Sequence, residues 1–322
     1  MIGPVQIRNY KSIRDLKFDA KRVNLFIGEP NTGKSNILEA LSFFAQGVAN
    51  NFPAIFRFKS VADLFFDQKV ANAINIVAGD WEFSLKFNGS DFAGQFLQGP
   101  GTVARIPKAD LTLSHGGARS FAALGAPVRF YRFAPLEKFP NNQPGALNPP
   151  FGDNLVAVLY SNEELRQRIG AVLRSQGFRL QLRPAENELL IAKDVNEELY
   201  SYPWKSVSET IRRVVFFMAV LETNRDMALL FDEPEANTFP FYTKYLAERI
   251  ALDETNQFFL TTHNPYLLSS IVEKTPRDQL AVFVTRLDKF ETRITQVPPA
   301  NLPELLELDS DAFFNLDRLV AA

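Results

Sequence analysis

The chain has 322 residues, of which 46% are hydrophobic and 22% are charged, and its formal net charge is −2. This composition predicts a folded protein with one large or two smaller domains, without the basic excess of a non-specific nucleic-acid binder. The chain has no cysteine, which excludes disulfides, thiolate metal sites and a cysteine nucleophile. We find neither a signal-peptide core nor an apolar run long enough to span a bilayer, so we expect a cytoplasmic protein that makes no contact with membranes.

Near the N-terminus, an alternating strand is followed by a strand, a glycine-rich loop and a helix. Residues 23–27 form a mostly apolar strand that ends at a glycine, and residues 33–46 carry apolar side chains at helical spacing. Residues 74–88 alternate in part and are predicted as strands. Residues 89–126 show no clear period and remain unassigned, and His115 within them is expected to be a loop residue without a chemical role.

The middle of the chain mixes short elements with a long loop. Residues 128–133 are strand-like and precede a stretch dense in proline, asparagine and glycine, which predicts an extended loop. Residues 162–175 are predicted as a helix. Two short strands then form a predicted hairpin around residues 184–187.

The last third has the pattern of a parallel α/β sheet. The stretch SETIRRVVFFMAVLET is so apolar that we expect a largely buried helix. Two nearly all-apolar strands follow, residues 227–231 and 257–262, with a helix from Tyr242 onward between them. Apolar strands that alternate with helices indicate a parallel sheet covered on both faces.

The glycine-rich loop matches a phosphate-binding motif. Residues 28–35 read GEPNTGKS, which fits G-x-x-x-x-G-K-[ST] between a strand and a helix. Its glycines allow backbone N–H groups to turn toward phosphates, Lys34 can reach the β and γ phosphates, and the Ser35 hydroxyl can bind Mg²⁺. A chance glycine-rich turn is the alternative, but the strand and helix on either side favour nucleotide binding.

Two acidic residues follow the first of the apolar strands near the C-terminus. Asp232 comes directly after this strand, where its carboxylate can hold Mg²⁺ through water. Glu233 is the candidate general base, because a carboxylate beside the metal site can polarise the attacking water. The alternative is an acidic helix N-terminus without a catalytic role.

A histidine ends the next strand along the chain. His263 lies in FFLTTHNPYLL, and parallel strands bring their carboxyl ends to the same crevice. A lone histidine is often structural, but this position is suited to a sensor of the γ-phosphate. We therefore predict that His263 faces the same nucleotide as the phosphate loop.

Four segments in this order, IRNYKSIRDL, GEPNTGKSNILEAL, LLFDEPEANTFP and NQFFLTTHNPYLL, resemble the ABC-type ATPases of the SMC, Rad50, RecF and overcoming-lysogenization-defect (OLD) group. The chain resembles in particular small bacterial AAA-family proteins related to the ATPase part of OLD. The resemblance covers roughly residues 1–70 and 200–290. It implies an α/β P-loop NTPase fold of the ABC ATPase-head type, with a mainly parallel central sheet, flanking helices and an antiparallel β subdomain.

The resemblance also implies a division of the chain and a set of site residues. We predict an N-terminal ATPase lobe (1–135), a loop-rich insertion with a helix and a hairpin (136–200) and a C-terminal ATPase lobe (201–322). ATP and Mg²⁺ are the implied ligands. Lys34, Glu233 and His263 are the implied catalytic residues, and Ser35 and Asp232 the metal ligands. The implied nucleotide-binding residues are Gly28, Asn31, Thr32, Gly33, Lys34, Ser35 and Asn36.

Relatives pair two chains head to tail, so the resemblance implies a homodimer or a higher oligomer with ATP at the interface. Ser208 of SVSETIRR aligns with the signature serine and would complete the ATP site of the other chain, although Thr210 stands at a glycine position. The alternative for this segment is a capping box of Ser206 and Glu209, and the two can coexist because a helix N-terminus also binds anions. Gln68 is merely a candidate for the Q-loop.

The expected function is an ATP-binding and ATP-hydrolysing dimeric switch that controls a partner or acts on DNA, in anti-phage defence or DNA repair. Only about 30 residues follow TRLDKF, too few for a nuclease domain, so we expect a separately encoded effector such as a nuclease. One alternative is a nucleotide-dependent interaction scaffold with little hydrolysis. A transporter ATPase subunit is another, and a metabolic kinase fits less well because it would not need His263.

Overall fold

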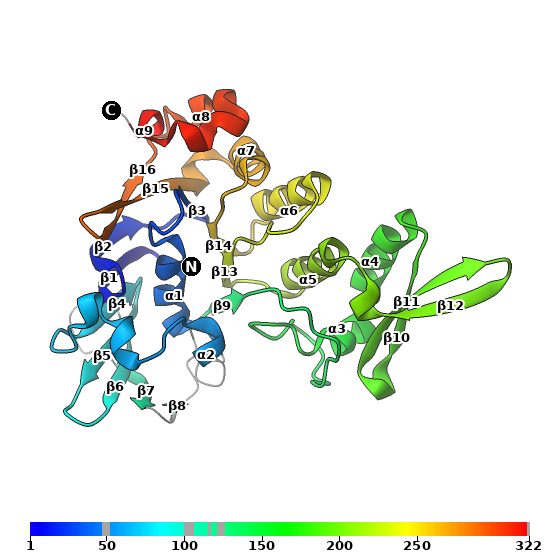
Figure 1. The fold of residues 1–322 in the computed structure, drawn as a ribbon, viewed down its shortest axis with the longest axis horizontal. Coiled ribbons are helices and arrows are strands. Elements are labelled where there is room, and N and C mark those ends of the chain that lie inside the picture. The colour runs from blue at the N-terminus through cyan, green and yellow to red at the C-terminus, as the bar shows by residue number, and fades with distance from the viewer. Residues whose placement is uncertain (47–51, 100–105, 115–116, 121–125, 321–322) are drawn as a thin grey trace.

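A computed structural model describes residues 1–46, 52–99, 106–114, 117–120 and 126–320. His115 lies outside the described residues. The described elements form three β-sheets, with helices packed between and beside them (Figure 1).

The central sheet has the strand order β16-β15-β3-β14-β13-β9. The strands from β15 to β9 run parallel, and β16 pairs antiparallel with β15 at one edge. β3 and β14 are buried along their whole length, as expected for parallel strands covered on both faces. This confirms the predicted α/β fold. The strands are β3 (Val23–Gly28), β9 (Val128–Tyr131), β13 (Ala228–Asp232), β14 (Gln257–Thr261), β15 (Leu280–Asp288) and β16 (Glu291–Gln296).

A second, antiparallel sheet is formed by the N-terminal part of the chain, in the order β2-β1-β4-β5-β6-β7-β8. Helix α1 (Lys34–Leu41) lies between this sheet and the central one (Figure 1), and Ile37 and Leu41 pack in one core with side chains of both sheets. The strands are β1 (Pro4–Tyr10), β2 (Ile13–Asp19), β4 (Ile74–Ala78), β5 (Trp81–Phe87), β6 (Phe92–Gln98), β7 (Ile106–Ser114) and β8 (Gly117–Ser120).

Helices α5 (Glu209–Thr223), α6 (Pro240–Leu252) and α7 (Pro265–Lys274) cover the other face of the central sheet (Figure 1). Strand β3 shows why both faces need cover. Leu25 and Ile27 belong to the core on the helix side, whereas Phe26 belongs to the core around α1. The alternation of side chains along a strand thus joins the two cores through one element.

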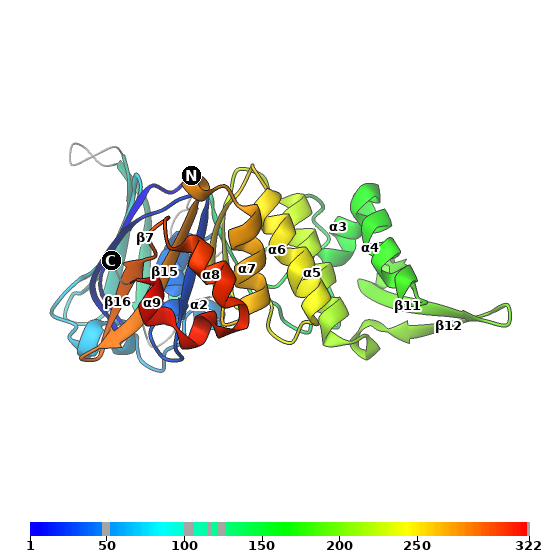
Figure 2. The same ribbon diagram turned by 90° about the horizontal axis from the view of Figure 1, so that it is seen from above.

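The third sheet, β10-β11-β12, lies with α3 (Leu155–Ser161) and α4 (Glu163–Ser175) at one end of the molecule, beyond α5 (Figures 1 and 2). The predicted hairpin is present as β10 (Arg179–Arg183) and β11 (Glu188–Val195). Strand β12 (Glu198–Pro203) was not predicted. All its residues are exposed, so it lacks the buried alternation that marks a strand in a sequence. The remaining helices are α2 (Phe52–Ile55), α8 (Leu302–Leu308) and α9 (Leu316–Leu319).

Three details correct the sequence-based expectations. The first helix ends at Leu41 and continues as a 3-10 turn to Phe44 rather than as one helix to residue 46. Strand β2 was missed between the two strands predicted at the N-terminus. The capping box is wrong, because Ser206 ends a separate 3-10 turn and Ser208 is the N-cap of α5, where its side chain accepts a hydrogen bond from the N–H of Ile211.

The central sheet takes strands from both predicted ATPase lobes, and the division at residues 135 and 200 stays a prediction. No helix within the described part of the chain has the length and apolar character that a membrane crossing requires.

Candidate functional site

The phosphate-loop motif connects β3 to α1, and its two glycines occupy positions that a side chain would not fit. Gly33 is the N-cap of α1 with φ of 92°, and a Cβ added there would lie 2.0 Å from Oγ1 of Thr292. A Cβ added at Gly28 would lie 2.3 Å from Oγ1 of Thr285. The loop therefore packs closely against β15 and β16, with the N-terminus of α1 turned toward the cavity that the motif lines.

Lys34 extends back along the loop instead of into solvent. Its Nζ donates hydrogen bonds to the carbonyl oxygens of Gly28 at 2.9 Å and Glu29 at 2.7 Å. Burial lowers the pKa of Lys34 to about 8, against the attraction of Glu233 and Asp232. A buried ammonium that donates to neutral carbonyl oxygens fits an anionic ligand, because phosphate oxygens would stabilise its charge better.

Ser35 and Asp232 meet across the sheet, 197 residues apart in the chain. Oγ of Ser35 donates to Oδ1 of Asp232 at 2.9 Å, and Oγ1 of Thr261 donates to the same oxygen at 2.6 Å. Arg132 lies 3.7 Å from Oδ2 of Asp232. A hydroxyl beside a carboxylate, both oxygen donors, fits Mg²⁺ bound together with phosphates and water. Among the described residues no group of three or more His, Cys, Asp or Glu side chains could hold a metal.

Glu233 and His263 are in contact, as expected from their places at two parallel strand ends. Nε2 of His263 lies 3.3 Å from Oε1 of Glu233. Glu233 has φ of 47°, and its N–H donates to the carbonyl and hydroxyl oxygens of Thr261. Burial and the charge of Lys34 lower the pKa of His263, against the attraction of Glu233 and Asp232. The contact with Glu233 places both side chains at the same edge of the site.

Lys34, Ser35, Glu233 and His263 line one cavity of about 710 Å³, whereas Asp232 and Gly28 are not among its lining residues. It is lined by residues 30–36, by Lys11, Ser12 and Arg57, by Glu233 and His263, and by Leu287 and Phe290. Asn31, Thr32, Gly33, Lys34, Ser35 and Asn36 are thus brought together with the candidate base and sensor. Ser208 does not line the cavity of its own chain, and neither does Gln68, whose side chain donates to Asp63.

Sequence reasoning missed a basic wall of this cavity. Lys11 in the β1–β2 turn and Arg57 after α2 both form ion pairs with Glu39 of α1, which is almost completely buried. The hydroxyl of Tyr10 donates to the same carboxylate at 3.0 Å. Lys11 and Ser12 lie in the segment IRNYKSIRDL. A Lys-Ser pair at the end of a predicted strand was the signal that could have marked them as site residues. Nothing in the sequence around Arg57 marked it as a site residue.

Glu235 is a buried carboxyl beside the backbone of His263. Its Oε1 accepts hydrogen bonds from the hydroxyl of Thr262 at 2.6 Å and from the N–H of His263 at 3.3 Å. Within the described residues its Oε2 has no partner. Burial raises the pKa of Glu235 to about 7. The side chain holds the backbone before the imidazole in place and does not reach the cavity itself.

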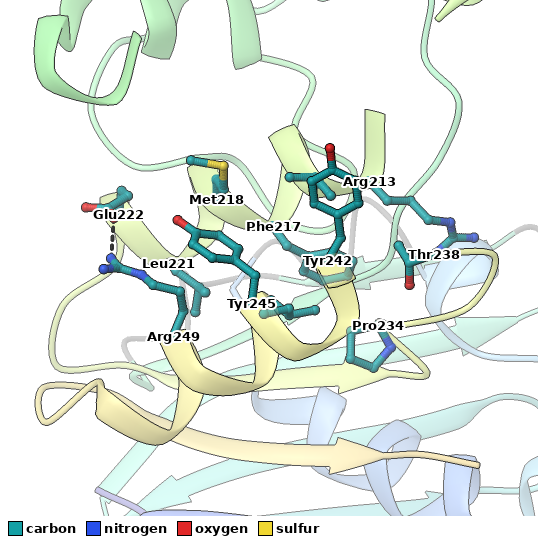
Figure 3. Close-up of a pocket in the computed structure, with 12 residues that line it drawn as sticks. Arg213, Phe217, Met218, Leu221, Glu222, Pro234, Thr238, Tyr242, Tyr245 and Arg249 are labelled. Carbon is teal, nitrogen blue, oxygen red and sulfur yellow. Dashed lines mark hydrogen bonds and ion pairs between the residues drawn. The ribbon is translucent and has the colours of Figure 1, made fainter. Parts of the chain in front are cut away.

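A second hollow lies between α5 and α6 and is mostly apolar (Figure 3). Phe217 and Met218 of α5 face Tyr242 and Tyr245 of α6, and Arg249 pairs with a glutamate at one end. Its volume is about 20 Å³, which is room for about one water molecule. It is a packing gap between two helices.

Two family models match separate parts of the chain. The model described as "AAA ATPase domain" matches residues 1–91. The model described as "AAA domain, putative AbiEii toxin, Type IV TA system" matches residues 122–269. The two matches cover the phosphate loop and the Asp232–His263 region, respectively.

Individual proteins and structures are also similar to this chain. An uncharacterised protein of Methanocaldococcus jannaschii is 32% identical over 111 residues, which cover 30% of this chain and 47% of that protein, so the chain spans about half of that relative. A crystal structure of an SMC head bound to the C-winged helix domain of ScpA aligns over 92% of this chain and 97% of that one, with TM-score 0.54 and 15% identity. The SMC head domain from Thermotoga maritima aligns over 92% and 99%, with TM-score 0.44 and 13% identity. The SMC head in the ScpA complex shares the fold.

Proposed function

We propose that this chain, an ABC-type P-loop ATPase of the AAA class, binds and hydrolyses ATP in the phosphate-loop cavity and acts as a dimeric switch for a partner. The observation that carries the proposal is that Ser35, Glu233 and His263 line one cavity although they lie far apart in the chain, and that Ser35 is hydrogen-bonded to Asp232. A hydroxyl, a metal-binding carboxylate, a base and a sensor together are what phosphoryl transfer to water requires.

The chain's own residues divide the work as follows. The N–H groups of residues 31–36 and the ammonium of Lys34 bind the phosphates, and the bonds from Lys34 to the loop carbonyls give way to phosphate oxygens. Glu233 takes a proton from the attacking water, and His263 contacts the γ-phosphate. Mg²⁺ that accompanies ATP would be held by Ser35 and Asp232 and would neutralise charge on the phosphates.

Phosphate release under saturating MgATP tests the hydrolysis. We expect a rate well above the buffer background for the wild-type chain. Tight ATP binding without phosphate release would reject hydrolysis and favour the alternative of a nucleotide-dependent scaffold. This alternative is based on the altered signature segment, which has Thr210 at a glycine position.

The second half of the ATP site would come from another copy of the chain. Ser208 is exposed at the N-terminus of the 15-residue helix α5, outside its own cavity. Because a capped helix N-terminus binds anions, Ser208 and the first turn of α5 can bind the γ-phosphate of a partner chain in a head-to-tail dimer.

Ser208→Asp separates the capping role from this proposed role. Aspartate caps a helix as well as serine, so the melting temperature should stay near that of wild type, but its charge would repel the partner's γ-phosphate and stop hydrolysis. Mixing this variant with an equally inactive Lys34→Ala variant should restore measurable hydrolysis, up to about a quarter of the wild-type rate, because half the dimers then contain one intact composite site. A mixture that stays inactive would contradict the head-to-tail site.

The switch would act on a separate partner. The family model that names a putative toxin of a Type IV TA system supports a role in defence, with a nuclease or toxin as the effector. The similar SMC head binds a winged-helix domain of another protein, which supports a protein partner. DNA binding rests on family analogy, and its measurement at several salt concentrations would test it.

A further inference from the structure

The turn between β15 and β16 holds an unusual pair of residues. Asp288 and Glu291 are the last paired residues of the hairpin, so Lys289 and Phe290 form a two-residue turn. Their φ angles are 47° and 66°. Turns with two positive φ angles are normally made of Asn-Gly or similar pairs, because a bulky side chain is disfavoured in this region. Strained residues of this kind gather at ligand-binding sites.

The strained aromatic side chain is also exposed. Phe290 has 83% of its surface accessible, and Leu287 on the same hairpin has 44%. Both line the phosphate-loop cavity. Positive φ angles are the favoured geometry of a two-residue hairpin turn, but a large apolar ring left in solvent contributes nothing to the core, so folding does not explain the choice of phenylalanine at this position.

The hairpin is fixed relative to the phosphate loop. Oγ1 of Thr292 donates to the carbonyl of Thr32 at 2.9 Å and lies 2.7 Å from Oγ of Ser12. The N–H of Thr292 donates to the carbonyl of Ser12 at 2.7 Å. Phe290 is only two residues from these bonds, so they fix the backbone of the turn at the rim of the cavity near the β1–β2 turn.

The strand order gives the bound nucleotide a direction. β14 and β13, which lead to His263 and Glu233, lie on one side of β3, and the β15–β16 hairpin lies on the other. A triphosphate with its γ end at Glu233 and His263 must therefore direct its nucleoside toward the hairpin and the β1–β2 turn.

We propose that Phe290 is the stacking platform for the nucleotide base, with Leu287 as a second apolar contact. This inference rests on the proposed binding of ATP at the phosphate loop. Every base has a π face, so Phe290 serves any nucleoside triphosphate, and a preference for adenine must come from other residues. The hydrogen bonds of Thr292 keep the turn that carries Phe290 beside the phosphate loop before the nucleotide binds.

Binding of ATP and of inorganic tripolyphosphate to Phe290 variants tests the proposal. We expect Phe290→Ala to weaken ATP binding by about tenfold or more, the effect of losing one base–aromatic stack, and to leave tripolyphosphate binding unchanged. Phe290→Tyr keeps a ring and should bind ATP like wild type. Phe314→Ala is the matched control, because Phe314 is 87% exposed but lies outside this cavity.

Phe290→Gly separates stacking from a structural role. Glycine suits the positive φ, so the nucleotide-free melting temperature should stay the same or rise while ATP affinity falls. The proposal is overturned if Phe290→Ala and Phe290→Gly bind ATP like wild type, if ATP and tripolyphosphate weaken equally, or if Phe314→Ala shows the loss instead. A wild-type chain that binds neither ligand would overturn the proposed function itself.

Discussion

Replacing Glu233 with glutamine is expected to lower ATP hydrolysis by about two to four orders of magnitude, the contribution of a well-placed general base, while ATP affinity stays near that of wild type. Glutamine has nearly the same shape and can keep the contact with His263, but it cannot accept the proton of the attacking water. Phosphate release and equilibrium binding of ATP, measured on the same preparation, check both halves of this expectation.

The chain offers a matched control in Glu29, a glutamate of the phosphate loop that is exposed and does not line the cavity. Glu29→Gln removes a carboxylate close to the phosphates without removing the base, so its turnover should equal that of wild type. Hydrolysis by Glu233→Gln at the wild-type rate would reject Glu233 as the base.

Lys34→Ala is expected to weaken ATP binding by on the order of a hundredfold or more, as for other buried charge pairs that lose one partner. The ammonium is buried beside the phosphate loop and donates to two of its carbonyl oxygens. Equilibrium binding of ATP measures the loss, and a variant that binds ATP like wild type would contradict the proposed site.

The same lysine predicts a pH dependence. Because the pKa of Lys34 is lowered to about 8 in the free protein, its amine becomes neutral as the pH rises above about 8. ATP affinity of the wild-type chain should then fall by up to about tenfold per pH unit. In Lys34→Ala, the titrating amine is absent, so its weak binding should lack this decline between pH 7.5 and pH 9.

How much of the site can be predicted from sequence depends on whether a residue belongs to a local pattern. The phosphate loop is a contiguous motif, and Asp232 and His263 follow strands that are recognisable by their apolar residues. Because the carboxyl ends of parallel strands meet at one edge of a sheet, the meeting of Ser35 with Asp232 was predictable across 197 residues.

The other residues of the cavity wall were not predictable, because they belong to no local sequence pattern. Lys11, Arg57 and Phe290 come from turns and connections of different sheets, and residues of these types are common on any surface. Their role depends on long-range packing such as the buried Glu39 between Lys11 and Arg57. A site completed by a second chain leaves even less trace, because Ser208 does not line the cavity of its own chain.

The segment after Glu233 has one consequence for how two ATP sites would work together. The carbonyl of Asn237 accepts a hydrogen bond from the hydroxyl of Thr210, and its side chain donates to Glu209, at the start of the helix that carries Ser208 as its cap. Within one chain, the segment that follows Glu233 is thus hydrogen-bonded to the start of α5, where Ser208 would contact the nucleotide of a neighbouring chain. In a head-to-tail dimer, these hydrogen bonds would connect each ATP site to the other. Hydrolysis at one site would then alter the geometry of the other site. We therefore expect the rate to depend cooperatively on ATP concentration.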